Sequence, residues 1–139
     1  MNARFVAPVF IHAHPVPDWE IRAFRIRFFG YEPVANRHCV ARIMATHTGT
    51  ACEEFEYVSL SNGGMYMAPS IPEGFSLQWR DGEQAHTCSA AAAGIRTSLA
   101  ALREMFDDTG DQQFIRALFR LEDYARQHPE RKFILGGAA

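Results

Sequence analysis

Residues 53–70 read Glu-Glu-Phe-Glu-Tyr-Val-Ser-Leu-Ser-Asn-Gly-Gly-Met-Tyr-Met-Ala-Pro-Ser. Two runs of strand-forming residues, 55–60 and 65–68, flank a polar segment that ends in two glycines. Asparagine and glycine tolerate the positive φ angles of tight hairpin turns, and proline cannot donate a hydrogen bond to a neighbouring strand. The stretch therefore predicts a β-hairpin whose second strand ends at Pro69.

The first part of the chain is rich in proline. Because three prolines fall within residues 1–17, a long helix is disfavoured there. We expect this segment to lie on the domain as an arm, with short extended pieces at residues 4–6 and 9–11.

Two helices are predicted between the arm and the hairpin. Asp18 is placed to cap a helix over residues 19–28 that ends at Gly30. A strand is the alternative for this element, because three apolar residues alternate with arginines: Phe24, Ile26 and Phe28. The second helix is predicted over residues 34–46 and ends at Gly49, with four inward residues: Cys39, Val40, Ile43 and Met44.

Two more strands follow the hairpin. Apolar and polar residues alternate over 75–80, which is typical of a strand with one buried face. Asp81 and Gly82 form a strong turn signal, and the chain is expected to return along residues 83–87. Together with the central hairpin, these strands predict a four-stranded antiparallel meander.

The C-terminal part predicts two further helices. Ser89 is placed to cap the first, and Gly94 within it indicates close packing against the sheet. Its apolar stripe is Ala92, Ile95, Leu99, Leu102 and Phe106. Thr109 and Gln112 have the spacing of a capping box that opens the second, which ends near His128. Its expected buried face is Phe114, Leu118, Leu121 and Ala125.

The chain closes on a short apolar segment over 133–135 and a tail over 136–139 that is expected to fray. A length of 139 residues suits one domain. We therefore predict a single α+β domain over residues 1–139, with a four-stranded antiparallel meander packed against three to four helices.

Composition excludes two simple functions. The chain has 14 basic and 16 acidic residues, a net charge of −2. A sequence-independent DNA binder normally carries a clear basic excess, and a protein that imitates DNA needs a dense surface of carboxylates. Neither description fits, so direct DNA binding is not expected.

The sequence also bears on location. We find no apolar run of the length that a membrane span requires, and no signal-peptide pattern at the N-terminus. An odd number of widely spaced cysteines suits reduced thiols better than a disulfide framework: Cys39, Cys52 and Cys88. We therefore expect a cytoplasmic protein with no membrane partner.

The turn of the hairpin carries a recognisable signature. Residues 60–69 read Leu-Ser-Asn-Gly-Gly-Met-Tyr-Met-Ala-Pro, which closely resembles the Leu-Ser-Asn-Gly-Gly-Phe-Tyr-Met-Ala-Pro of plasmid-borne antirestriction proteins of the KlcA/ArdB type. Residues 89–95 resemble that family's Ser-Ala-Asp-Ala-Ala-Gly-Ile segment, and residues 121–130 resemble its last helix. The resemblance covers residues 24–133, with departures that include Ala91 in place of an acidic residue and a tail without acidic residues.

The resemblance implies a function. It predicts a non-enzymatic protein of a mobile element that relieves type I restriction when plasmid or phage DNA enters a new host, by protein contacts and not by DNA mimicry. The implied partner is the host type I restriction enzyme. A nucleic-acid-binding or regulatory module is the alternative, based on arginines beside aromatic residues in the first element: Arg22, Arg25 and Arg27 with Phe24, Phe28 and Phe29.

Two regions are candidate partner contacts. The first is the hairpin turn and the residues after it: Asn62, Gly63, Gly64, Tyr66 and Met67. Because Tyr66 and Met67 lie on opposite faces of a strand, we expect one of them to be exposed. The second region is an acidic patch between two helices, formed by Glu104, Asp107, Asp108 and Asp111. Asp107 and Asp108 are its candidate contacts for a basic partner, and the alternative is that the patch serves the electrostatics of the neighbouring helix termini.

The residues with catalytic or metal-binding chemistry form no strong pattern. His86 and Cys88 with Cys52 or His47 supply zinc-ligand types, but the sequence has no Cys-x-x-Cys or His-Glu-x-x-His spacing. Three glutamates at positions 53, 54 and 56 fit the polar edge of a strand. We therefore predict no catalytic residue, no cofactor and no metal.

Overall fold

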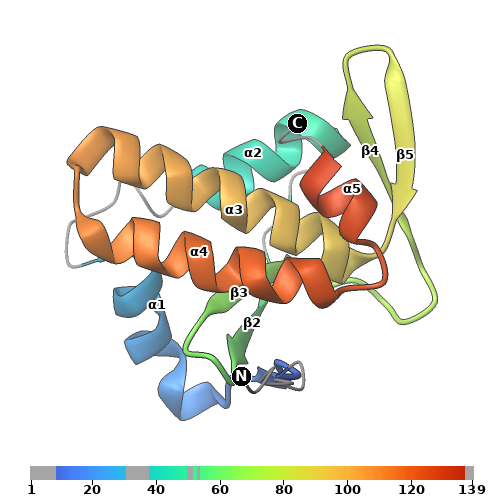
Figure 1. Ribbon diagram of the computed structural model, residues 1–139. Coiled ribbons are helices and arrows are strands. Elements are labelled where there is room, and N and C mark those ends of the chain that lie inside the picture. The colour runs from blue at the N-terminus through green and yellow to red at the C-terminus, as the bar shows by residue number, and fades with distance from the viewer. Residues whose placement is uncertain (1–8, 31–37, 50–51, 53, 137–139) are drawn as a thin grey trace, which may run out of the picture.

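The computed structural model describes residues 9–30, 38–49, 52 and 54–136 (Figure 1). The domain is α+β. Its helices are the short 3-10 helix η1 (Asp18–Glu20) and α1 (Ile21–Phe29), α2 (Cys39–Thr48), α3 (Ala90–Thr109), α4 (Gln112–Gln127) and α5 (Arg131–Gly136). Its strands are β1 (Ala13–Pro15), β2 (Phe55–Leu60), β3 (Met65–Pro69), β4 (Leu77–Asp81) and β5 (Gln84–Cys88).

The predicted central hairpin is confirmed. Strands β2 and β3 pair antiparallel from Phe55 opposite Pro69 to Ser59 opposite Met65. The Leu60 amide donates to the Gly64 carbonyl at 2.9 Å, and Gly63 has a φ angle of +86°. The turn therefore uses the glycine for the left-handed conformation that the sequence predicts.

The predicted four-stranded meander is wrong. The strands form two separate antiparallel sheets, one in the order β1-β2-β3 and the other containing β4 and β5. The outward edge of β3 is occupied by α3, because the Ser98 hydroxyl accepts from the Met67 amide at 3.0 Å. Because α3 occupies this edge, β4 cannot pair with β3. Figure 1 shows the β4–β5 hairpin beyond the end of the layer formed by α3 and α4.

The helix α3 is the centre of the core. In Figure 1 it runs beside α4, with β3 against the pair and α2 and α5 at its other sides. A Cβ placed on Gly94 would lie 2.4 Å from the Met67 carbonyl oxygen and 2.5 Å from Ala68 Cα. This contact confirms the predicted reason for a glycine inside the helix.

Strand β1 makes part of the N-terminal segment an edge of the three-stranded sheet, where the sequence predicted only an arm that lies on the domain. Strand β1 pairs with β2, and the extended piece expected at residues 9–11 is not a strand. The side chain of Gln127 fastens the arm, since its Oε1 accepts from the Ile11 amide at 2.9 Å and its Nε2 donates to the Val9 carbonyl at 2.7 Å. The piece expected at residues 4–6 lies outside the described residues.

Most helix ends agree with the sequence. Gly30, Gly49 and His128 follow the last residues of α1, α2 and α4, and the Ser89 hydroxyl caps α3 by accepting from the Ala92 amide. The buried face of α4 is also as predicted. The predicted start of the second helix, at residue 34, lies outside the described residues, and α2 begins at Cys39.

The first element is a helix, as predicted, and not the alternative strand. Several other local predictions are wrong. The side chain of Asp18 caps nothing. The cap of α4 is Asp111, whose carboxylate accepts from the Gln113 amide, because Gly110 has already ended α3 with a φ of +70°. The segment after Pro129 forms α5, which includes Gly136, so the frayed tail does not begin there.

The second sheet is fastened to the helices by a polar cluster around Asp81. Its carboxylate accepts from the Trp79 indole at 3.1 Å and from the Arg96 guanidinium at 2.7 Å. Arg96 also lies over the rings of Trp79 and Phe133, 5.0 and 4.8 Å from their centres, and His47 stacks on Trp79 at 4.4 Å. The cluster joins β4 to α2, α3 and α5.

Candidate functional site

The signature turn is anchored on α4. Asn62 accepts from the Gly64 amide through Oδ1 and donates through Nδ2 to the Arg120 carbonyl, each at 2.9 Å. The side chain of Arg120 lies across Gly63, whose added Cβ would be 3.2 Å from Arg120 Nη1. The turn is thus held in a fixed position against the helix, with Gly63 at the surface.

The expectation that Tyr66 or Met67 is exposed is wrong. Their exposed fractions are 5% and 4%. Strand β3 has β2 at one edge and α3 at the other. The Tyr66 ring packs on the Tyr124 ring of α4, and Met67 lines a hollow together with Phe29 and Phe55, so neither side chain reaches the surface. Burial, with Tyr124 beside it, raises the pKa of the Tyr66 phenol far above its usual value.

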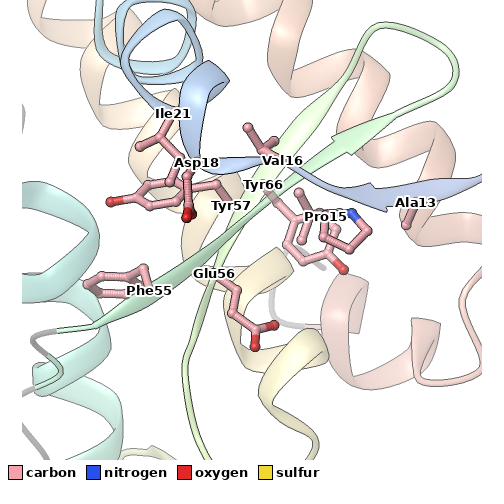
Figure 2. Close-up of a pocket in the computed structure, with 10 residues that line it drawn as sticks. Ala13, Pro15, Val16, Asp18, Ile21, Phe55, Glu56, Tyr57 and Tyr66 are labelled. Carbon is pink, nitrogen blue, oxygen red and sulfur yellow. The ribbon is translucent and has the colours of Figure 1, made fainter.

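A hollow of about 470 Å³ lies where β1 ends on β2 (Figure 2). Its apolar walls include Pro15, Ile21 and Phe55, and its carboxylates are Asp18 and Glu56. Figure 2 shows Phe55 and Tyr57 on one side of β2 and Glu56 on the other. The described residues that line the hollow contain no histidine, cysteine or serine, so they provide neither a Ser-His nor a Cys-His pair.

The acidic patch is divided by the structure. Glu104 pairs with Arg42, and Asp111 caps α4. Asp107 and Asp108 are exposed at the end of α3, and neither forms an ion pair with any described residue. These two carboxylates are therefore the part of the patch that is accessible to a partner.

The arginines of the first element do not alternate with accessible aromatic rings. Phe24 and Phe28 are 1% and 0% exposed, and Phe29 is buried beside them. Arg25 lies over the Tyr57 ring and donates to its hydroxyl at 2.7 Å. A base cannot stack on buried rings, so this element lacks the aromatic half of the predicted nucleic-acid surface.

The thiols are unreactive in character. Cys39, Cys52 and Cys88 are free, and burial raises the pKa of Cys39 and of Cys88 to about 11. The described residues contain no group of three or more histidine, cysteine or acidic side chains placed to hold a metal ion. His86 instead packs against the Phe133 ring.

A second hollow, of about 360 Å³, was not foreseen from the sequence. We call it the arginine hollow, and it is lined by Arg27, Gly63, Met65, Gln113, Arg116, Ala117 and Arg120. The residues come from α1, the β2–β3 turn and α4, so no local motif reveals them. The one sequence signal is the i, i+4 spacing of Arg116 and Arg120, which places both on one face of a helix.

The fold, the hairpin turn and the close contact at Gly94 together define a class. A family model described as "Antirestriction protein" matches residues 51–137, from the start of the central hairpin to the end of α5. The Escherichia coli K12 protein described as "Uncharacterized protein YafX" is 33% identical over 129 residues, which cover 87% of this chain and 83% of that protein. This chain belongs to the antirestriction protein family.

A solved structure has the same fold. It belongs to work on KlcA and ArdB, described as showing "a novel fold and antirestriction activity against Type I DNA restriction systems in vivo but not in vitro". The two chains superpose with a TM-score of 0.76 at 25% sequence identity, over 96% of each. The resemblance in the signature segment is therefore confirmed for the whole fold.

One finding concerns the membrane. Within the described part of the chain, no helix combines the length and the apolar character needed to cross a bilayer.

Proposed function

We propose that this protein relieves type I restriction of plasmid or phage DNA that enters a host cell. The observation that carries the proposal is the family match over residues 51–137, which includes the signature turn fixed on α4. The KlcA and ArdB structure, whose chain has the same fold, is described with antirestriction activity against type I systems in vivo. The protein acts in the cytoplasm and originates from a mobile element.

The mechanism is contact with a host protein, of which the type I restriction enzyme is the first candidate. Charge supports contact over DNA mimicry, because 14 basic residues balance 16 acidic ones. Several carboxylates are also neutralised by arginines, as in the pairs of Asp81 with Arg96 and of Asp123 with Arg126. A surface of this kind does not reproduce the continuous negative charge of a duplex.

The contact surface includes Asp107 and Asp108 and the accessible part of the signature turn, which is the half-buried Asn62 and the exposed Gly63. Both segments adjoin α4, since the aspartates precede it and Asn62 bonds to Arg120 within it. Gly64, Tyr66 and Met67 are buried and support the surface from below. An exposed pair of carboxylates suits a basic patch on the partner.

The test is the plating efficiency of unmodified phage on cells with an active type I restriction system, with and without this protein. Cells that lack the system provide the control. We expect recovery of plating in the restricting cells alone. If the protein accumulates in folded form and plating does not recover, the proposal is wrong.

The acidic contact is tested with the double variant Asp107→Asn/Asp108→Asn. A lost contact worth about 1.4 kcal/mol weakens binding about tenfold, so we expect a clear loss of the plating gain. The matched control is Glu73→Gln/Glu83→Gln, which removes the same charge from two other exposed positions. Equal behaviour of the two double variants would remove the aspartates from the contact surface.

A separate variant tests whether Tyr66 only supports the contact surface from below. Tyr66→Phe keeps the ring packed on Tyr124 and removes the hydroxyl at the wall of the hollow in Figure 2. A supporting residue predicts unchanged plating with this variant. A loss of plating in a normally folded protein would instead make the hydroxyl a direct contact.

A further inference from the structure

The arginine hollow concentrates positive charge. Arg27 of α1 and Arg116 and Arg120 of α4 all line this space of about 360 Å³, and all three residues are exposed. No acidic residue lines the hollow among the described residues. The whole chain carries a net charge of −2, so this local excess is a property of the site and not of the composition.

Within the described ranges, none of the three guanidinium groups forms an ion pair, whereas Arg42, Arg96 and Arg126 each pair with a carboxylate. Guanidinium groups stay charged at neutral pH, and like charges held close together repel. Binding of an anion in the hollow therefore lowers the electrostatic free energy of this arrangement.

The signature turn shapes the hollow. Gly63 forms part of the wall, and its φ of +86° is a conformation that other residues rarely adopt. A Cβ at this position would lie 3.2 Å from Nη1 of Arg120, where it would press against the guanidinium. The Asn62 bond to the Arg120 carbonyl fixes the turn on the helix turn that carries this arginine. Glycine at position 63 therefore leaves room for the Arg120 side chain beside the hollow.

The chemistry of the lining selects the ligand. A guanidinium group donates two parallel hydrogen bonds to an oxygen pair, and several such groups match the oxygens and double charge of a phosphate better than a single carboxylate. On α4, Phe119 follows Arg116 by three residues and precedes Arg120, and its side chain is 56% exposed. Phe119 does not itself line the hollow, but residues three apart are neighbours on a helix surface, so its ring is suited to stack on the base of a nucleotide whose phosphate enters the hollow.

We propose that the arginine hollow binds the phosphate of a nucleotide unit, either a free nucleotide or part of a single nucleic-acid strand. The proposal does not depend on the proposed relief of restriction, because it concerns a separate property of the folded protein. Binding of this kind needs one local cluster of arginines and does not need an excess of basic residues over the whole surface. Binding weakens with added salt, since exposed charges are screened.

The test follows the amide NMR signals of Gly63, Gly64 and Ala117 in low salt while one of three probes is added: inorganic pyrophosphate, adenosine monophosphate or a short single-stranded DNA oligonucleotide. We expect saturable shifts at these amides with at least one probe. Arg116→Gln should weaken that binding about tenfold, because it removes one charged donor pair.

The matched control is Arg126→Gln, which removes the same charge from the same helix outside the hollow, where Arg126 pairs with Asp123. We expect its affinity for the probe to stay at the wild-type value. Tighter binding of the oligonucleotide identifies a nucleic-acid strand as the source of the phosphate, and comparable binding of the smaller probes identifies a free nucleotide.

Two results would overturn the proposal. One is the absence of shifts at these amides with all three probes in low salt, which would leave an acidic protein surface as the ligand of the hollow. The other is an equal loss of affinity in Arg116→Gln and Arg126→Gln, which would mean unspecific attraction. Both measurements use purified, folded protein, so a negative result in the plating assay does not affect them.

Discussion

The hydroxyl of Ser98 bonds both outward-facing backbone groups of Met67, since it accepts from the amide at 3.0 Å and donates to the carbonyl at 3.3 Å. Ser98 is fully buried in α3, and Met67 lies in the middle of β3. The helix therefore satisfies the edge of the sheet at the place where a further strand would pair. This contact explains why the central sheet ends at β3.

Replacing this hydroxyl should destabilise the protein. Ser98→Ala leaves the Met67 amide buried without a partner, which costs about 1–3 kcal/mol in the free energy of unfolding. Urea denaturation measures the change, with Ser76→Ala at an exposed position as the control. A loss below about 0.5 kcal/mol, the usual range of surface substitutions, would contradict the assigned role.

The close approach at Gly94 predicts a second loss of stability. Gly94→Ala gains about 1 kcal/mol of helix propensity, but its methyl group meets the β3 backbone, where overpacking costs about 1–3 kcal/mol or more. We expect a net decrease in the denaturation midpoint. Ala100→Gly, at an exposed position of the same helix, measures the propensity alone. A more stable Gly94→Ala variant would show that α3 can move away from the sheet.

The Asp81 cluster predicts a dependence of stability on pH. Burial alone raises the pKa of Asp81, but the Trp79 indole and the Arg96 guanidinium hold that pKa below its usual value. Because the pKa is lower in the folded protein, the carboxylate stabilises the fold above the pKa of the unfolded chain, and this contribution is lost as pH falls through the folded value. Asp81→Asn should therefore lower Tm at neutral pH.

The difference in Tm between wild type and Asp81→Asn should shrink in acid. Thermal unfolding monitored by circular dichroism across the acidic range provides the measurement, and Asp108→Asn at an exposed position is the control. If the difference in Tm stays constant down to strongly acidic pH, the charge of Asp81 is not the cause of the lower Tm.

The buried thiols predict a pattern of chemical labelling. Burial raises the pKa of Cys39 and Cys88 to about 11, so the thiolate that reacts with iodoacetamide is scarce at neutral pH. Cys52 is half-buried, and its pKa is raised by burial to a lesser extent. We expect mass spectrometry of the native protein to find Cys52 labelled first. In urea all three thiols should react at similar rates, and faster native labelling of Cys39 would contradict the burial.

Local signals in the sequence predicted the parts of the fold that depend on local chemistry. The glycine-containing turn, Ser89 as a cap and the buried face of α4 each follow from a few neighbouring residues. The buried face of α3 was predicted only in part, because Leu99 and Phe106 are half-buried while Ala101 and Met105 are fully covered. The failure at Thr109 has a local cause too, because the left-handed conformation of Gly110 moves the cap to Asp111. The short helix α5 was missed because six residues provide too little periodicity, although Ile134 anchors it in the core.

The remaining features depend on distant residues. The division into two sheets follows from Ser98, which lies 31 positions after Met67. The burial of Tyr66 depends on Tyr124, and the arginine hollow joins Arg27 of α1 to two arginines of α4. One sequence without related sequences contains no signal for such pairs. The family resemblance supplied the function class, and no physical pattern in the chain would have done so.

The clasp of Gln127 on the N-terminal arm has a consequence for synthesis on the ribosome. Gln127 follows Ile11 by 116 positions, so the ribosome makes the arm long before the residue that holds it. Until α4 has left the exit tunnel and folded, the pairing of β1 with β2 lacks this clasp. The order of synthesis therefore makes the clasp a late step, and it secures a strand pair whose two members are both made early in the chain.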